Sequence, residues 1–96
     1  MRQTYMVTYD VSDPKRLRKV FKTMKGYGEH LQLSVFRCEL NHRELVELRA
    51  RLGAIIHYEQ DQVLFVDVGP EDGRGNTSIS ALGRAYCAPS RRAVVV

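Results

Sequence analysis

The sequence has few of the residues that build metal clusters and disulfide frameworks, and it has no long apolar run. Its two cysteines, Cys38 and Cys87, lie 49 positions apart and form no paired-cysteine motif, which argues against a disulfide framework or a zinc site. No apolar run approaches the roughly 20 residues of a membrane span. The amino terminus lacks the apolar stretch and cleavage site of a secretory signal. We therefore expect a cytoplasmic protein that makes no membrane contact.

Familiar catalytic motifs are also missing. The chain contains no glycine-rich phosphate loop, no HExxH motif and no nucleophile elbow, and its three histidines are scattered. Its 96 residues, without a visible linker or repeat, predict one domain over 1–96. A domain of this size buries only roughly 60–65% of the surface that its unfolded chain exposes. The core is therefore thin, which favours a dimer.

Charge is distributed unevenly along the chain. Residues 1–26 carry seven cations against two acids, or +5; residues 27–72 carry −5; and residues 73–96 carry +4. Positive charge at both ends is typical of a polyanion partner such as RNA or DNA, although a solvated surface has the same composition. The acids of the middle segment, including Glu39, Glu44 and Asp61, are expected to be ordinary surface charges.

The first half of the chain predicts a strand and a helix. Residues 4–11 are β-branched and aromatic, which is typical of a strand. Asp13 can then cap a helix whose first position is Pro14 and which runs to about Lys25. The positions spaced for one apolar helix face are Leu17, Val20, Phe21 and Met24.

The remaining patterns complete an α+β fold. Residues 30–40 form either one long strand or two short ones. Asn41 and Glu44 have the spacing of a capping box at the start of a second helix, and 62–68 is a clear strand. Two further short strands are predicted over 79–82 and 93–96. If 30–40 is a hairpin, the order becomes βαββαβ with both helices on one face of an antiparallel sheet, and a second copy packed face to face can cover the other.

One face of the first helix is strongly basic. Five cations lie within about 120° of the helix surface opposite the apolar stripe, and Arg16 flanks them. These cations are Lys15, Arg18, Lys19, Lys22 and Lys25. Like charges at this spacing weaken an isolated helix. The face either binds phosphates, together with Arg91 and Arg92 near the carboxyl terminus, or is solvated and neutralised by acids of the middle segment.

Asp10 is the acid with the most unusual position, because it ends an apolar strand just before the basic helix. It either orients the strand–helix turn or serves as a metal ligand. One carboxylate is weak support for a divalent cation. Two copies of Asp10 near a twofold axis would repel each other unless a proton or a cation such as Mg²⁺ lay between them.

Several short segments, in order and spacing, resemble those of a known family. They are Tyr9-Asp10, RLRKV at 16–20, YG at 27–28, Gln32 with SVF at 34–36, VLFVDVG at 63–69, LGRAY at 82–86 and RRAVVV at 91–96. Together they resemble the small CRISPR-associated adaptation proteins, the second core protein of CRISPR systems, described as endoribonuclease-like. The resemblance spans essentially the whole chain.

The resemblance implies a ferredoxin-like fold with an extra carboxyl-terminal strand, in a homodimer whose terminal strand crosses to the partner. It also implies cleavage of single-stranded RNA or double-stranded DNA with Mg²⁺ or Mn²⁺, and a role beside the CRISPR integrase in holding prespacer DNA. By position, Asp10 would be the catalytic metal ligand, and the surrounding catalytic residues would be Tyr9, Arg16, Arg18, Ser34 and Phe36. Arg37 stands where many members have an acid, so it receives no catalytic role.

Two other functions share these sequence features. A non-catalytic scaffold would use the same dimer and basic surfaces to hold duplex DNA for the integrase, with Asp10 as a structural residue. A ferredoxin-like protein-interaction or toxin-type module would bind DNA weakly and with little dependence on salt.

Overall fold

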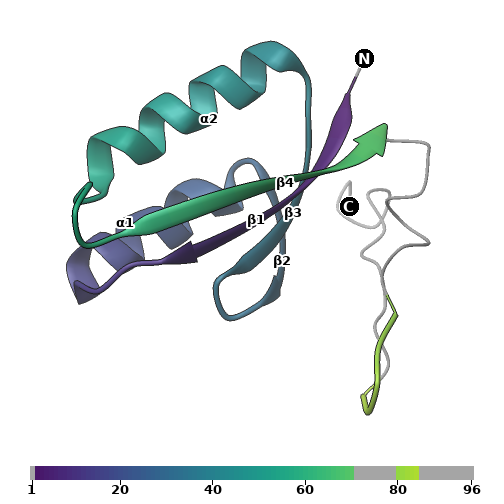
Figure 1. The fold of residues 1–96 in the computed structure, drawn as a ribbon, viewed down its shortest axis with the longest axis horizontal. Coiled ribbons are helices and arrows are strands. Elements are labelled where there is room, and N and C mark those ends of the chain that lie inside the picture. Colours follow the sequence, from purple (N-terminus) through teal and green to yellow (C-terminus); the bar gives the residue numbers. More distant parts are fainter. Residues whose placement is uncertain (1, 71–79, 85–96) are drawn as a thin grey trace, which may run out of the picture.

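The computed structural model describes residues 2–70 and 80–84 of the chain. In this part it contains four strands and two helices (Figure 1). They are β1 (Gln3–Asp10), α1 (Pro14–Lys25), β2 (Gly28–Gln32), β3 (Val35–Leu40), α2 (His42–Ile55) and β4 (Gln62–Pro70). Among these residues no helix has the length and apolarity needed to cross a membrane.

The four strands form one antiparallel sheet in the order β2-β3-β1-β4. Val7 at the centre of β1 pairs with Phe36 of β3 on one side and with Phe65 of β4 on the other. Because paired residues point to the same face of a sheet, these three side chains lie on one face. The βαββαβ order and the antiparallel sheet confirm the predicted α+β architecture.

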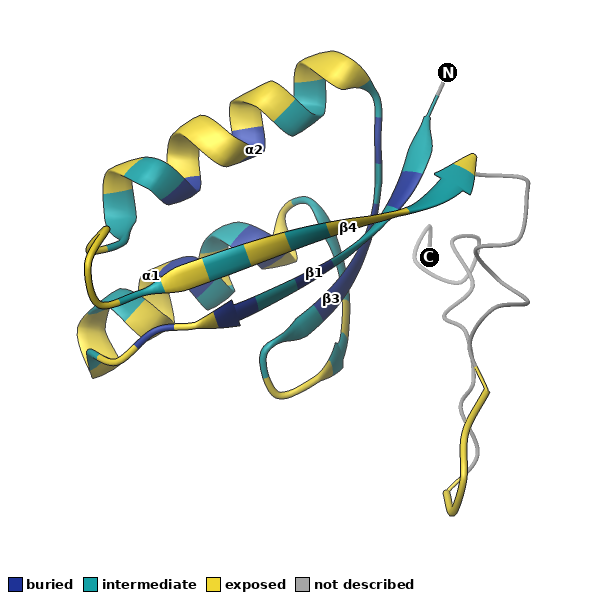
Figure 2. Cartoon of the chain, viewed as in Figure 1, coloured by how far each residue is buried: buried dark blue, intermediate teal, exposed yellow. Residues whose placement is uncertain are grey.

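Both helices pack on this face and form the core with it. Val20 and Met24 of α1 and Leu48 and Leu52 of α2 are buried in one cluster with Val7 and its strand neighbours. The buried positions of α2 recur along its length, one helical turn apart (Figure 2). This spacing is that of an amphipathic helix whose apolar stripe faces a sheet.

Local capping determines where the elements begin, as the sequence predicted. Asp13 Oδ2 accepts a hydrogen bond from the backbone N–H of Arg16 at 3.0 Å, and Pro14 occupies the first turn of α1. At the start of α2, Asn41 and Glu44 form a complete capping box at 2.8 and 2.9 Å. The extended run 30–40 divides at 33–34 into the hairpin of β2 and β3.

Two predictions of secondary structure need correction. The predicted strand over 79–82 is wrong in its described part, because residues 80–82 are exposed and unpaired with the sheet, and Gly83 turns the chain with φ +90°. Leu17 was expected in the buried stripe of α1, but its side chain is exposed. The predicted last strand at 93–96 lies outside the described residues, as do Arg91 and Arg92.

The second face of the sheet is partly apolar and carries no helix. In the register of β1 with its neighbours, Met6 pairs with Val66, and Thr8 pairs with Val35 and Leu64. Leu64 and Val66 are 49% and 48% exposed. We call this surface, made by Met6, Thr8, Val35, Leu64 and Val66, the open sheet face.

Candidate functional site

Asp10 lies at the carboxyl end of β1, opposite Gln62 of β4, and is exposed. Within the described residues its carboxylate takes part in no hydrogen bond or ion pair. Alternation along β1 places Asp10 on the same side as Thr8, at the end of the open sheet face. This carboxylate is therefore available to a ligand or to a second chain.

The turn after Asp10 is held by a different acid. Asp61, which precedes β4, accepts hydrogen bonds from the backbone N–H groups of Ser12 at 3.1 Å and His57 at 2.8 Å. It also accepts from the Arg16 guanidinium, at 2.8 Å from Nε and 3.2 Å from Nη2. The Asp61 side chain is 0% exposed. Asp61 thus ties the start of α1 to the loop between α2 and β4.

The environment of Asp61 favours its charged form. The hydrogen bond from Arg16, together with the two backbone N–H groups, holds the pKa of Asp61 well below its usual range, although burial acts in the opposite direction. The same contact raises the pKa of Arg16. The expectation that Asp61 is an ordinary surface charge was therefore wrong, because its partners are remote in sequence but adjacent in the fold.

The predicted catalytic residues occupy several places. Tyr9, Arg18 and Ser34 come together at a groove between α1 and the β2–β3 turn. Consecutive strand residues point to opposite faces, so Tyr9 faces the helices whereas the neighbouring Asp10 does not. Phe36 is completely buried in the core.

Tyr9 and Phe36 form part of an aromatic core beneath the groove. Their ring centroids are 6.3 Å apart in a stacked arrangement, and burial raises the pKa of the Tyr9 phenol. The phenol therefore stays protonated at neutral pH. In this arrangement Phe36 supports the neighbouring side chains by packing.

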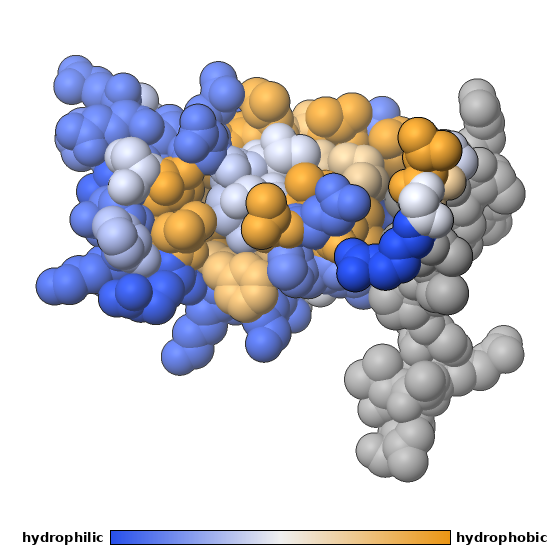
Figure 3. Space-filling view, turned by 90° about the horizontal axis from the view of Figure 1, so that it is seen from below, coloured by the Kyte–Doolittle hydropathy of each residue, from blue (hydrophilic) through white to orange (hydrophobic). Residues whose placement is uncertain are grey.

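The basic face of α1 lies on the surface, and one of its cations, Lys25, also lies over the Phe21 ring, 5.6 Å from the ring centroid. All five of its cations are exposed, and none forms an ion pair with an acid of residues 2–70 or 80–84. These cations are Lys15, Arg18, Lys19, Lys22 and Lys25. Within this part of the chain, acids of the middle segment therefore do not neutralise the face. Figure 3 shows hydrophilic side chains gathered at the end of the molecule where α1 begins, with apolar surface toward the middle.

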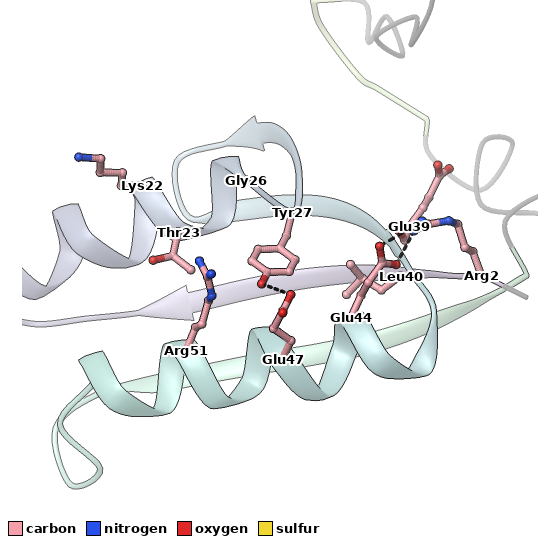
Figure 4. A pocket seen from close by; sticks show the side chains of 10 residues that line it. All are labelled: Arg2, Lys22, Thr23, Gly26, Tyr27, Glu39, Leu40, Glu44, Glu47 and Arg51. Atoms are coloured by element: carbon pink, nitrogen blue, oxygen red, sulfur yellow. Dashed lines mark hydrogen bonds and ion pairs between the residues drawn. The ribbon is translucent and has the colours of Figure 1, made fainter.

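A second cleft lies between the end of α1, α2 and β3, and its charges are largely paired (Figure 4). The Tyr27 hydroxyl donates to Glu47 Oε1 at 2.5 Å, and Arg51 lies 5.8 Å from the centroid of the Tyr27 ring. At the other end of the cleft, Arg2 Nη2 donates to Glu44 Oε2 at 3.0 Å. These contacts join α2 to the α1–β2 turn and to the residue before β1, which is a structural role. Glu44 therefore both caps α2 and pairs with Arg2, so it too is more than a surface charge.

Arg37 occupies the polar end of the open sheet face. It is buried, and its Nη2 atom lies 3.9 Å from Glu29 Oε2 and 3.7 Å from Glu39 Oε2. Glu39 was expected to be an ordinary surface charge, but it lies beside a buried arginine. Arg37 thus helps to hold together the pair of strands β2 and β3.

Within the described residues, a single chain supplies few ligands for a metal ion. Residues 2–70 and 80–84 contain no group of three His, Cys, Asp or Glu side chains close enough to hold one. Asp10 is an oxygen donor of the type that Mg²⁺ prefers, and it is not used by the fold.

Comparison with known proteins identifies the family. The family model described as CRISPR associated protein Cas2 matches residues 3–74. The chain belongs to the Cas2 family. A relative from Rhodospirillum rubrum, "CRISPR-associated endoribonuclease Cas2 1", is 42% identical over 96% of this chain and 89% of its own length. A Geobacter sulfurreducens relative, "CRISPR-associated endoribonuclease Cas2", is 36% identical over the full length of both.

Solved structures of Cas2 proteins have the same fold. The crystal structure of Streptococcus pyogenes Cas2 matches with a TM-score of 0.74 at 35% identity, covering 83% of this chain and 99% of that one. A Thermus thermophilus protein described as hypothetical matches with a TM-score of 0.77 at 32% identity, covering 91% and 98%. The CRISPR-associated family expected from the sequence motifs is thereby confirmed.

Proposed function

We propose that this Cas2 protein is a metal-dependent endonuclease of CRISPR adaptation that hydrolyses phosphodiester bonds of single-stranded RNA or double-stranded DNA. The relatives from R. rubrum and G. sulfurreducens are named endoribonucleases, and one from T. thermophilus is named an endonuclease. The observation that carries the proposal is the unused Asp10 carboxylate. Asp13 caps α1 and Asp61 holds the turn, so neither structural task needs Asp10.

The active form is proposed to be a homodimer packed through the open sheet face. Exposed Leu64 and Val66 would become buried against the same face of a second copy. The proposed twofold axis passes near the Asp10 end of this face, which would bring the two Asp10 carboxylates together. Their mutual repulsion would favour a bound cation.

The two Asp10 carboxylates would hold Mg²⁺ or Mn²⁺, with water in the other positions. When bound, such an ion polarises a phosphate oxygen and lowers the pKa of a coordinated water. The residues of the chain then position the nucleic acid. Arg18 offers an exposed cation on α1, whereas Arg16 is paired with Asp61 and would act by holding the turn that carries Asp10.

The basic face of α1 would hold the nucleic-acid backbone, with Arg91 and Arg92 as further contacts. Lysine and arginine contacts to phosphates carry no base information, so binding is expected to be independent of sequence. The same surface would grip prespacer DNA beside the CRISPR integrase. Since one chain offers so few metal ligands, a scaffold without catalysis is the second candidate.

A cleavage assay separates these candidates. End-labelled single-stranded RNA and duplex DNA are incubated with the wild type, Asp10→Asn and Glu59→Gln, each with Mg²⁺ and with chelator. Glu59 is an exposed acid of the neighbouring α2–β4 loop, so Glu59→Gln removes the same charge from a residue that is not a proposed metal ligand. Cleavage that needs both metal and Asp10 supports the nuclease. Binding without cleavage in all three proteins would favour the scaffold.

A further inference from the structure

The groove between α1 and the β2–β3 turn is an open, largely apolar surface beside the basic face. Two exposed leucines form its opposite walls: Leu17 from α1, and Leu33, which is 89% exposed, from the turn. The residues that line it are Tyr9, Leu17, Arg18, Phe21, Lys22, Leu33 and Ser34. Leu17 is 37% exposed, and neither leucine belongs to the buried core cluster.

The base of the groove is formed by packed aromatic rings. Phe21 meets Phe36 edge to face at 5.6 Å and His30 edge to face at 5.0 Å. His30 Nε2 donates to the carbonyl oxygen of Leu33 at 2.8 Å, which fixes the turn that carries Leu33. A ligand would therefore enter a groove that exists before binding, which reduces the ordering cost of association.

The charge of the groove selects the type of ligand. Arg18 and Lys22 stand on its rim one helical turn apart, and none of its lining residues is acidic. At 1.5 Å per residue they are separated by about 6 Å along the axis of α1. The groove therefore suits a ligand that has an apolar part and at least one negative charge beside it.

We propose that this groove binds an unpaired base of a single-stranded nucleic acid, while Arg18 and Lys22 contact the adjoining phosphates. Bases that are not paired bind proteins by laying their faces against aromatic and apolar side chains, which is independent of sequence. The inference rests on the nucleic-acid partner proposed above and adds a preference for unpaired strands. It also gives Tyr9, Arg18 and Ser34 a common location that is separate from Asp10.

An acidic peptide with an apolar side chain is the competing ligand, because it has the same combination of charge and apolar surface. The nucleic acid is favoured by the continuation of positive charge beyond the groove. Lys15, Lys19 and Lys25 extend the rim cations along α1 without an interleaved acid. A regularly charged backbone can use all of these positions, whereas a short peptide needs only the two at the rim.

The test compares Leu33→Glu with Val46→Glu. Both positions are exposed and apolar, but Val46 is 53% exposed on α2, away from the groove. Each variant is titrated against a single-stranded RNA that carries a fluorescent adenine analogue, and against a blunt duplex. Leu33→Glu should weaken single-strand binding about tenfold or more, because it removes an apolar wall and repels phosphate. Stacking should quench the analogue on the wild type and on Val46→Glu only.

The outcomes separate this inference from the proposed function. Loss of single-strand affinity in Leu33→Glu, with duplex affinity changed less than about threefold, supports the groove. Equal affinities and equal quenching in both variants would overturn it, while salt-dependent duplex binding would leave the proposed function standing. Absence of nucleic-acid binding by the wild type would overturn both. Binding of an acidic peptide that Leu33→Glu abolishes, with RNA binding unchanged, would assign the groove to peptide instead.

Discussion

Removing cations from the basic face of α1 should raise the free energy of unfolding of the protein and lower its affinity for nucleic acid. Lys15 and Lys19 are exposed and lie one turn apart, and neither forms an ion pair within the described residues. The double variant Lys15→Gln/Lys19→Gln removes one like-charge pair. It also removes a cation from the first turn, where the helix dipole disfavours positive charge. These effects should raise the free energy of unfolding by about 0.5–1 kcal/mol at low salt.

Binding should change in the other direction. Each phosphate that a cation neutralises contributes about −0.9 to the slope of log K against log salt for duplex DNA. If Lys15 and Lys19 both contact phosphates, the slope of log K against log salt should be shallower in the double variant by about 1.8 for each α1 helix that contacts the duplex. Over a fourfold rise in salt, this corresponds to about a 12-fold smaller loss of affinity.

The assay is fluorescence anisotropy with a labelled blunt duplex over a range of salt concentrations, together with urea unfolding of each protein. Arg43→Gln is the control, because Arg43 is an exposed cation on α2 outside the basic face. Its slope should stay at the wild-type value. An unchanged slope in Lys15→Gln/Lys19→Gln, or an equal decrease in Arg43→Gln, would refute the assignment of the phosphate-binding surface to α1.

Three further predictions follow from contacts in the fold. The pKa of Asp61 is lowered in the folded protein, so Asp61 contributes its full stabilisation at a pH above 3.8, the pKa in the unfolded chain. This stabilisation is lost as the pH falls through the folded-state pKa. Asp61→Asn should therefore unfold in less urea at pH 7 and lose less stability on acidification, and equal pH profiles of the two proteins would contradict this. Gly28→Ala should lower the free energy of unfolding measured in urea by about 1–3 kcal/mol, because an added Cβ would lie 2.6 Å from the carbonyl oxygen of Arg37. Gly26→Ala is the control and should change stability little, because a Cβ added there would lie 3.4 Å from the nearest atom. Burial raises the pKa of Cys38 to about 12, so its thiol should resist alkylation at pH 8 until urea unfolds the protein, and rapid labelling of the native chain at Cys38 would be inconsistent with the core.

Local signals in the sequence were sufficient to predict most of the fold. Asp13 with Pro14 and Asn41 with Glu44 mark helix starts by side chains that satisfy nearby N–H groups, and such contacts span only three residues. The end of β4 was less predictable. It extends to Pro70 because residues beyond an irregularity in the register at Thr4–Tyr5 still pair with β1.

Interactions between distant segments could not be predicted in this way. Arg16 and Asp61 are 45 positions apart, and nothing around Asp61 distinguishes it from the other acids of the middle segment. Only the fold shows that Asp61 holds the β1–α1 turn and that Asp10 does not. Strand alternation, which can be read from the sequence, places Tyr9 and Asp10 on opposite faces of the sheet. The groove at Tyr9 could not be predicted, because it forms only where α1 and the β2–β3 turn meet in space.

Two Asp10 side chains are proposed to share one divalent cation at a dimer interface. We would first titrate the purified protein with Mn²⁺ by calorimetry, alongside sedimentation of the same samples. We expect one ion for every two chains in the wild type, and loss of that binding in Asp10→Asn while the protein remains a dimer. Mn²⁺ binding that is unchanged in Asp10→Asn, or a wild type that sediments as a monomer, would contradict it.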